Sequence, residues 1–85
     1  MSAISVVTLY SRPGCHLCDE ARERLEALRE RGARFALREV DIEGDEELHR
    51  RLLELIPVVE VDGERACELL FDEDAVLVRI GTLSA

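Results

Sequence analysis

Residues 10–18 read Tyr10-Ser11-Arg12-Pro13-Gly14-Cys15-His16-Leu17-Cys18. An apolar run rich in β-branched residues precedes this stretch, and a run with helical spacing follows it, which predicts a strand-to-helix junction at the cysteines. A helix N-terminus favours a thiolate, because its unpaired N–H groups and its dipole stabilise negative charge. The pair therefore indicates a disulfide that opens and closes, with Cys15 as the attacking thiolate and Cys18 as the resolving thiol.

Strand and helix patterns alternate along the rest of the chain. Runs of β-branched and aromatic residues predict strands at 4–10, 35–42, 58–61 and 64–70. Apolar residues at three- and four-residue steps predict helices at 15–31, 45–55 and 72–80. The expected order is β-α-β-α-β-β-α, an α/β fold with helices on both sides of a small mixed sheet.

Details of these elements follow from short-range chemistry. The first helix is expected to bury one face and to expose the i,i+4 and i,i+3 pairs Glu20–Arg24 and Glu26–Arg29. That buried face is predicted to contain Leu17, Ala21, Leu25 and Leu28. Asp45 and Asp72 are expected to cap the second and third helices.

Asp62-Gly63 predicts a two-residue hairpin turn between the last two strands. Such a turn predicts four cross-strand pairs, which are Val61 with Glu64, Glu60 with Arg65, Val59 with Ala66, and Val58 with Cys67. Opposite charges at Glu60 and Arg65 favour this register.

The length, charge and composition of the chain limit its domain organisation and the partners it could bind. The chain has 85 residues, a net charge of −8 and 47% hydrophobic residues, which suit one domain over residues 1–85 and disfavour disorder. Residues 43–85 carry twelve acidic and four basic residues, whereas residues 1–42 carry seven of each. An acidic half disfavours nucleic acid as a partner, because its phosphates would be repelled.

The sequence shows neither a signal peptide nor an apolar run of the length that a membrane span needs, so no membrane partner is expected. Three cysteines, two of them in a C-x-x-C, suit a reducing compartment, and we expect a cytoplasmic location.

The chain resembles glutaredoxin-like proteins of the thioredoxin superfamily. The residues that carry the likeness are Leu9 to Cys18, Val40-Asp41-Ile42, and Ile56-Pro57-Val58-Val59-Glu60-Val61-Asp62-Gly63. The resemblance implies a thioredoxin-like fold with sheet order 2-1-3-4. It also implies a cis peptide at Ile56-Pro57 facing Cys15, and a disulfide-containing protein or a low-molecular-weight thiol as substrate. It implies no bound organic cofactor.

The chain departs from the family pattern where glutaredoxins hold glutathione. Two glycines and an acidic residue are usual there, whereas this chain has Cys67-Glu68-Leu69-Leu70, and Leu55 replaces the usual threonine before the cis-proline. The carboxylate of Glu68 would repel the anionic tripeptide, which disfavours glutathione as the preferred substrate.

Alternatives remain for individual residues. Arg12 could stabilise the Cys15 thiolate or meet a substrate carboxylate, or it could be a solvated loop residue. Protonated, His16 would favour the thiolate by charge, and otherwise it is an exposed side chain of modest effect. Cys67 is favoured as a small buried hydrophobe over a third redox thiol.

We therefore interpret the chain as a dithiol–disulfide oxidoreductase with Cys15 and Cys18 as catalytic residues and Arg12, His16 and Pro57 as supporting residues. A non-catalytic thioredoxin-fold binding or redox-sensing module is the alternative. A metal site is a weaker reading, because zinc needs about four ligands and the sequence has no second C-x-x-C.

Overall fold

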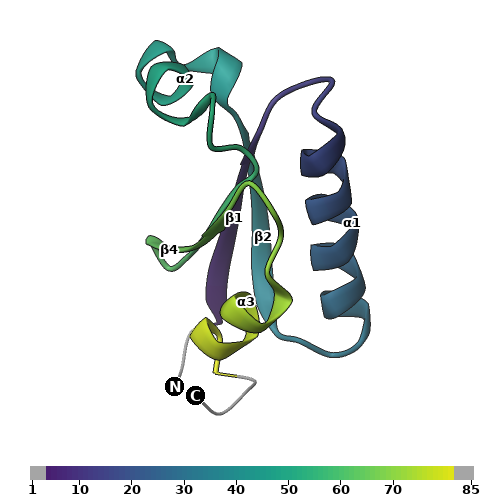
Figure 1. Cartoon of the computed structure of the whole chain (residues 1–85). Coiled ribbons are helices and arrows are strands. Elements are labelled where there is room, and N and C mark those ends of the chain that lie inside the picture. Colours follow the sequence, from purple (N-terminus) through teal and green to yellow (C-terminus); the bar gives the residue numbers. More distant parts are fainter. Residues whose placement is uncertain (1–3, 82–85) are drawn as a thin grey trace.

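The computed structural model describes residues 4–81, so residues 1–3 and 82–85 of the predicted domain lie outside the described residues (Figure 1). The elements are β1 (Ser5–Ser11), α1 (His16–Glu30), β2 (Phe35–Asp41), a 3₁₀ turn (Ile42–Gly44), α2 (Glu46–Leu52), β3 (Val58–Val61), β4 (Glu64–Glu68) and α3 (Glu73–Arg79). The sheet order is β2-β1-β3-β4. Both the predicted element order and the thioredoxin-like sheet order are confirmed.

The β1–α1–β2 unit forms the half of the fold that carries the cysteines. β1 and β2 are parallel, as a helical crossover requires, and Ser11 at the end of β1 pairs with Asp41. Alternation along β1 buries Val7 and Leu9 on one face of the sheet. β1 thus ends directly before the loop that leads to Cys15.

α1 buries a face that differs from the prediction at one position. The buried residues are Cys18, Ala21, Leu25 and Leu28, whereas Leu17 is 43% exposed. The prediction that Leu17 is buried was wrong. Cys18 lies on the same helix face as Ala21 and Leu25, so Cys18 is buried in the core at the position expected for Leu17. Leu17 is left at the surface within the C-x-x-C.

Helices cover both faces of the sheet with separate hydrophobic clusters. The larger cluster joins α1 and α3 to one face, with Leu25 and Val76 packed among Val7, Leu9 and Val59. The smaller cluster lies on the α2 side, and its buried members are Cys18, Ile42, Leu52, Ile56 and Val58. Figure 1 shows α2 apart from α1 and α3, near the end of the sheet that leads into α1.

The β3–β4 hairpin follows the predicted turn and half of the predicted register. Asp62 and Gly63 have φ of 51° and 86°, as a two-residue turn with both central residues left-handed requires. Val61 pairs with Glu64 and Glu60 with Arg65, which is confirmed, but a bulge follows.

Beyond the bulge, the predicted pairs were wrong. Val59 pairs with Cys67, and Val58 pairs with Glu68. Ala66 is the extra residue that a bulge adds to one strand, and it shifts every later pair by one position. Cys67 therefore lies opposite Val59 and not opposite Val58, the residue next to Pro57.

The predicted helix caps are confirmed. The carboxylate of Asp45 accepts hydrogen bonds from the N–H groups of Glu47 and Leu48, at 2.9 and 3.1 Å. The carboxylate of Asp72 accepts one from Ala75 at 3.0 Å. Side-chain oxygens at these positions satisfy N–H groups that the first helical turn leaves unpaired.

Glu20 and Arg24 do not form the i,i+4 ion pair that their spacing in the sequence predicts. Arg24 lies 3.7 Å from Glu73 of α3, instead of pairing with Glu20, and Glu20 lies 3.7 Å from His16. The expectation for Arg24 was wrong, because the folded chain brings an acidic residue of another helix within its reach.

Candidate functional site

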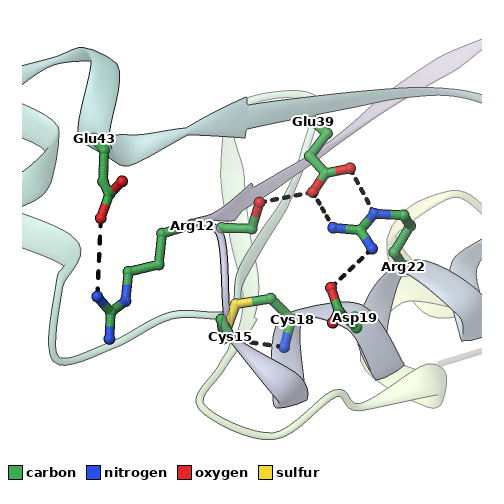
Figure 2. Close-up of a disulfide and its surroundings, with 8 residues drawn as sticks. Arg12, Cys15, Cys18, Asp19, Arg22, Glu39 and Glu43 are labelled. Carbon is green, nitrogen blue, oxygen red and sulfur yellow. Dashed lines mark hydrogen bonds and ion pairs between the residues drawn. A yellow bond between two sulfur atoms is a disulfide. The ribbon is translucent and has the colours of Figure 1, made fainter.

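Cys15 and Cys18 form a disulfide at the start of α1 (Figure 2). Their Cα atoms are 5.2 Å apart, within the usual range for such a bond. Cys15 is the N-cap residue of α1 and is half-buried, whereas Cys18 is completely buried. Of these two cysteines, Cys15 therefore has the side chain that is partly open to solvent, and Cys18 has none of its surface exposed.

The backbone around Cys15 favours negative charge on its sulfur. The N–H of Cys18 donates a hydrogen bond to the Cys15 Sγ at 3.2 Å. α1 has 15 residues, so its dipole is added to this hydrogen bond at its N-terminus. The preceding loop turns into the helix through Gly14, whose φ of +80° is a conformation that glycine adopts at no steric cost.

The peptide bond between Ile56 and Pro57 is cis, as the resemblance implied. Both residues are buried. Ile56 belongs to the smaller cluster with Cys18, and Cys15 packs against that cluster. The cis-proline segment and the disulfide therefore share one hydrophobic cluster, which joins residues far apart in the sequence.

A segment after β4 lies along the backbone of this cis-proline segment. The N–H of Leu69 is 3.0 Å from both the Leu55 and the Pro57 carbonyl oxygens. These two carbonyls are thus already used within the chain, and the Leu69 backbone is held beside Pro57.

Arg12 and His16 flank the disulfide in the sequence, but the charged groups nearest to their side chains are carboxylates. The guanidinium of Arg12 is 3.9 Å from the Glu43 carboxylate, and Figure 2 shows it directed towards Glu43. His16 is highly exposed, and its Nε2 lies 3.7 Å from the Glu20 carboxylate, a contact that is an ion pair only when the imidazole is protonated. A supporting role for either residue is still a prediction.

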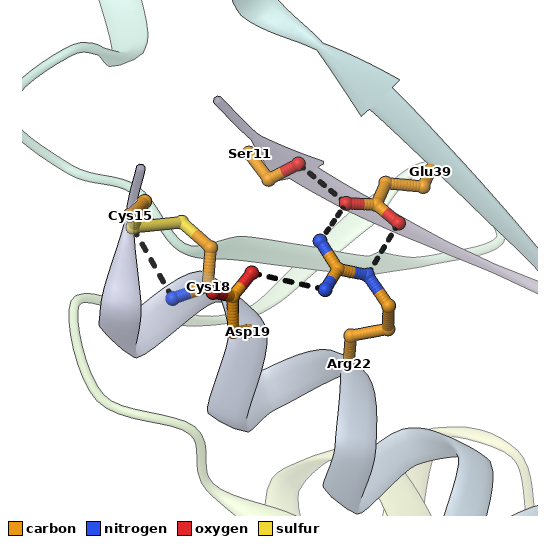
Figure 3. Close-up of polar contacts among 6 residues, drawn as sticks. All are labelled: Ser11, Cys15, Cys18, Asp19, Arg22 and Glu39. Carbon is orange, nitrogen blue, oxygen red and sulfur yellow. Dashed lines mark hydrogen bonds and ion pairs between the residues drawn. A yellow bond between two sulfur atoms is a disulfide. The ribbon is translucent and has the colours of Figure 1, made fainter. Parts of the chain in front are cut away.

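A polar network beside Cys18 was missed by the sequence analysis (Figure 3). Glu39 of β2 accepts hydrogen bonds from Ser11 at 2.7 Å and from Arg22 Nε at 2.6 Å. Arg22 also donates to Asp19 at 3.0 Å. The network joins the end of β1, the second half of β2 and the first turns of α1, so it holds the part of α1 next to the two cysteines against the sheet.

Glu39 is the centre of this network. Its hydrogen bonds with Arg22, the larger effect, and with Ser11 lower the pKa of its carboxyl group, although partial burial raises it. The i,i+3 spacing of Asp19 and Arg22 is visible in the sequence, but no local signal connects either residue to Glu39.

Cys67 is half-buried against the larger cluster, whereas the disulfide belongs to the smaller one. Burial raises the pKa of its thiol, although the hydrogen bond from the Asp72 N–H to the Cys67 Sγ lowers it in part. Its partner Val59 belongs to the cluster under α1 and α3, whereas Cys18 belongs to the other cluster. The predicted pairing with Val58, which suggested a third redox thiol, is therefore absent.

Within residues 4–81, no three His, Cys, Asp or Glu side chains come together in a way that could hold a metal ion. None of the helices in the described part of the chain has both the length and the apolar character that crossing a bilayer requires.

Comparison with known families decides the relationship of this chain. The family model described as the glutaredoxin-like domain (DUF836) matches residues 6–81. The chain belongs to this glutaredoxin-like family. No curated protein matches it.

Solved structures of other proteins share the fold of this chain. Protein Ne2328 from Nitrosomonas europaea is 26% identical to this glutaredoxin-like chain with a TM-score of 0.81, and the match covers 95% of this chain and 96% of that one. Protein XcR50 from X. campestris is 32% identical with a TM-score of 0.64, over 85% of this chain and 91% of that one.

A mutant thioredoxin from Halobacterium salinarum is 22% identical with a TM-score of 0.64, over 95% of this chain and 75% of that one. At this identity the likeness concerns the fold alone. A C-x-x-C pair at the start of α1 in a glutaredoxin-like thioredoxin fold suggests a redox function.

Proposed function

We propose that this protein is a thiol–disulfide oxidoreductase that reduces disulfides through Cys15 and Cys18. One observation carries the proposal: a half-buried N-cap cysteine is joined by a disulfide to a fully buried cysteine one turn into the same helix. The difference in access supports different roles for the two sulfurs, because an attacking sulfur must reach a substrate and a resolving sulfur needs to reach only its neighbour.

The reaction begins with both cysteines reduced. The Cys15 thiolate attacks one sulfur of the substrate disulfide, so a Cys15–substrate bond forms and the other substrate sulfur leaves as a thiolate, which takes a proton from water. The N–H of Cys18 and the dipole of α1 stabilise the Cys15 thiolate before the attack.

Cys18 then loses its proton to water and attacks the Cys15 Sγ. The Cys15–Cys18 disulfide forms and the second substrate sulfur leaves as a thiolate, so the substrate gains two electrons and the protein loses two. A thiol reductant from solution returns the protein to the dithiol state. We propose that the reaction takes place in the reducing cytoplasm, where this cysteine content is usual.

The test is turnover of bis(2-hydroxyethyl) disulfide with excess dithiothreitol. The wild-type protein should raise the rate above the uncatalysed background, and Cys15→Ser should abolish this increase. In a separate reaction without dithiothreitol, the pre-reduced Cys18→Ser protein should accumulate a mixed disulfide of one substrate half per protein, measured by intact-protein mass. Cys67→Ala is the matched control and should keep the wild-type rate.

Two results would overturn the proposal. One is full activity of the Cys15→Ser protein, and the other is the absence of any wild-type turnover. The second result would favour the alternative, a binding or redox-sensing module of the same fold.

A further inference from the structure

Three leucines beside the redox pair are exposed to solvent. Leu17 is 43% exposed, Leu69 is 46% exposed and Leu70 is 70% exposed. Together with Glu20, Arg24 and Phe71 they line one hollow of about 290 Å³. Leu17 lies between the two cysteines in the sequence, so this apolar hollow adjoins the site at which a substrate disulfide must meet Cys15.

The backbone holds two of these leucines in place. Leu69 has a φ of 69°, a left-handed conformation that is uncommon for residues other than glycine and costs free energy. Its N–H lies 3.0 Å from the carbonyl oxygens of both Leu55 and Pro57, which fixes the strained residue against the cis-proline segment. The exposed side chains of Leu69 and Leu70 therefore extend from a position fixed relative to the disulfide.

An acidic hollow adjoins the apolar one. It has a volume of about 640 Å³ and shares Arg24, Leu70 and Phe71 with the first. Its other charged lining residues are Glu68, Asp72, Glu73 and Asp74.

Arg24, the single basic residue in this lining, is already engaged. Its guanidinium lies 3.7 Å from Glu73 and 5.0 Å from the centre of the Phe71 ring. Glu73 also lies 3.3 Å from Arg31, and Glu68 pairs with Arg65 at 3.0 Å. Asp72 and Asp74 are the lining carboxylates for which the described residues show no ion pair, so the hollow keeps negative charge that complements a cation.

We propose that the two hollows together dock the polypeptide segment beside the disulfide of a protein substrate. An apolar side chain of that segment packs against Leu17, Leu69 and Leu70, and a lysine or arginine enters the acidic hollow. This inference rests on the proposed function, since the substrate cysteine must lie at Cys15. It selects a basic protein with an apolar residue near its disulfide over small anionic disulfides.

The first test compares two peptide disulfides of equal length. One has leucine and arginine beside its cysteine, and the other has serine and glutamate. The wild-type protein should reduce the leucine–arginine peptide with a kcat/KM at least about tenfold higher, the ratio expected when one apolar side chain is buried. Equal values for the two peptides would overturn the inference.

Substitutions then identify the residues that cause the preference for the leucine–arginine peptide. Leu70→Ser should lower the ratio between the peptides several-fold, and Asp74→Asn should weaken the preference for arginine alone. Ile4→Ser is the matched control, because Ile4 is 50% exposed but precedes β1, at the opposite end of that strand from Cys15. A loss of preference in Ile4→Ser as large as in Leu70→Ser would contradict the assigned surface.

A binding measurement separates this inference from the redox chemistry. Peptides with serine in place of cysteine are titrated into the protein, and amide NMR shifts of Leu17, Leu69 and Leu70 are followed. Selective shifts with the leucine–arginine peptide, without turnover of any disulfide, would support the docking surface and reject the redox function. Turnover of bis(2-hydroxyethyl) disulfide without selective shifts would reject the docking surface alone.

Discussion

The N–H of Cys18 donates to the Sγ of Cys15 across 3.2 Å, so Cys18 itself stabilises negative charge on the sulfur for which we propose the attacking role. Both residues belong to one helical turn, which makes this contact independent of how the rest of the chain packs. Their access to solvent does depend on packing, because Cys18 fills a place in the core between α1 and α2. The pair therefore combines a local electrostatic effect with a tertiary difference in exposure.

This arrangement predicts a difference in reactivity between Cys15 and Cys67. In the fully reduced protein at pH 7, iodoacetamide should alkylate Cys15 at least about tenfold faster than Cys67, as measured by peptide mass spectrometry. The Cys15 thiolate is stabilised at a helix N-terminus, whereas burial raises the pKa of Cys67. In urea the two rates should converge, and equal rates in the folded protein would contradict the prediction.

The Glu39 network predicts a pH-dependent contribution to stability. A carboxyl group whose pKa is lower in the folded than in the unfolded protein stabilises the fold above its unfolded pKa, and this stability is lost as the pH falls through the folded pKa. Glu39→Gln should lower the free energy of unfolding by about 0.5–1 kcal/mol at pH 7, the range of partly exposed ion pairs.

Below about pH 4 the difference between the wild-type protein and Glu39→Gln should shrink towards zero. Urea unfolding at several pH values measures it. Glu26→Gln, an exposed position on α1, is the control and should follow the wild-type curve. A difference that stays constant down to pH 2 would show that the Glu39 charge is not its cause.

The backbone conformations of two glycines, Gly63 in the hairpin turn and Gly44 in the 3₁₀ turn, predict different losses of stability on substitution by alanine. Gly63 has a φ of +86°, so Gly63→Ala should destabilise the fold by about 1–2 kcal/mol, the cost of a side chain in the left-handed region. Gly44 has no positive φ, and an added Cβ there meets no atom within 4 Å. Gly44→Ala should therefore change stability by less than about 0.5 kcal/mol. Thermal unfolding compares them, and equal effects would contradict this account of the turn.

The N-cap contact of Asp45 predicts that Asp45→Ala lowers the stability of the fold and that Asp45→Asn lowers it much less. Asp45→Ala removes the acceptor for two backbone N–H groups and should cost about 1 kcal/mol. Asp45→Asn keeps the side-chain oxygen and should restore most of that stability. Chemical denaturation measures both variants, and a loss in Asp45→Asn as large as in Asp45→Ala would show that the cap contact is unimportant.

Most of the fold could be predicted because its signals are local. The Asp45 and Asp72 caps act on N–H groups two or three residues away, and the Asp62-Gly63 turn needs only its own backbone conformation. The cis peptide at Pro57 came from the resemblance, since the spacing of residues contains no signal for it.

The errors share one cause, which is competition between residues distant in sequence. Either Leu17 or Cys18 could have been buried in the core. The packing of α1 against the sheet and the Ile56 segment buries Cys18 and leaves Leu17 exposed. The bulge at Ala66 moved Cys67 from Val58 to Val59, because a one-residue shift brings a strand residue to the opposite face.

By itself, the sequence determined the order of the elements, the turns and caps between them, and the placement of a cysteine pair at a helix start, because each depends on residues within a few positions. Only the tertiary structure decided which cysteine is buried, that Glu39 joins Ser11 and Arg22, and that Leu69 and Leu70 stand exposed beside Leu17. Those contacts depend on strand register and helix packing, where many distant side chains compete for the same space.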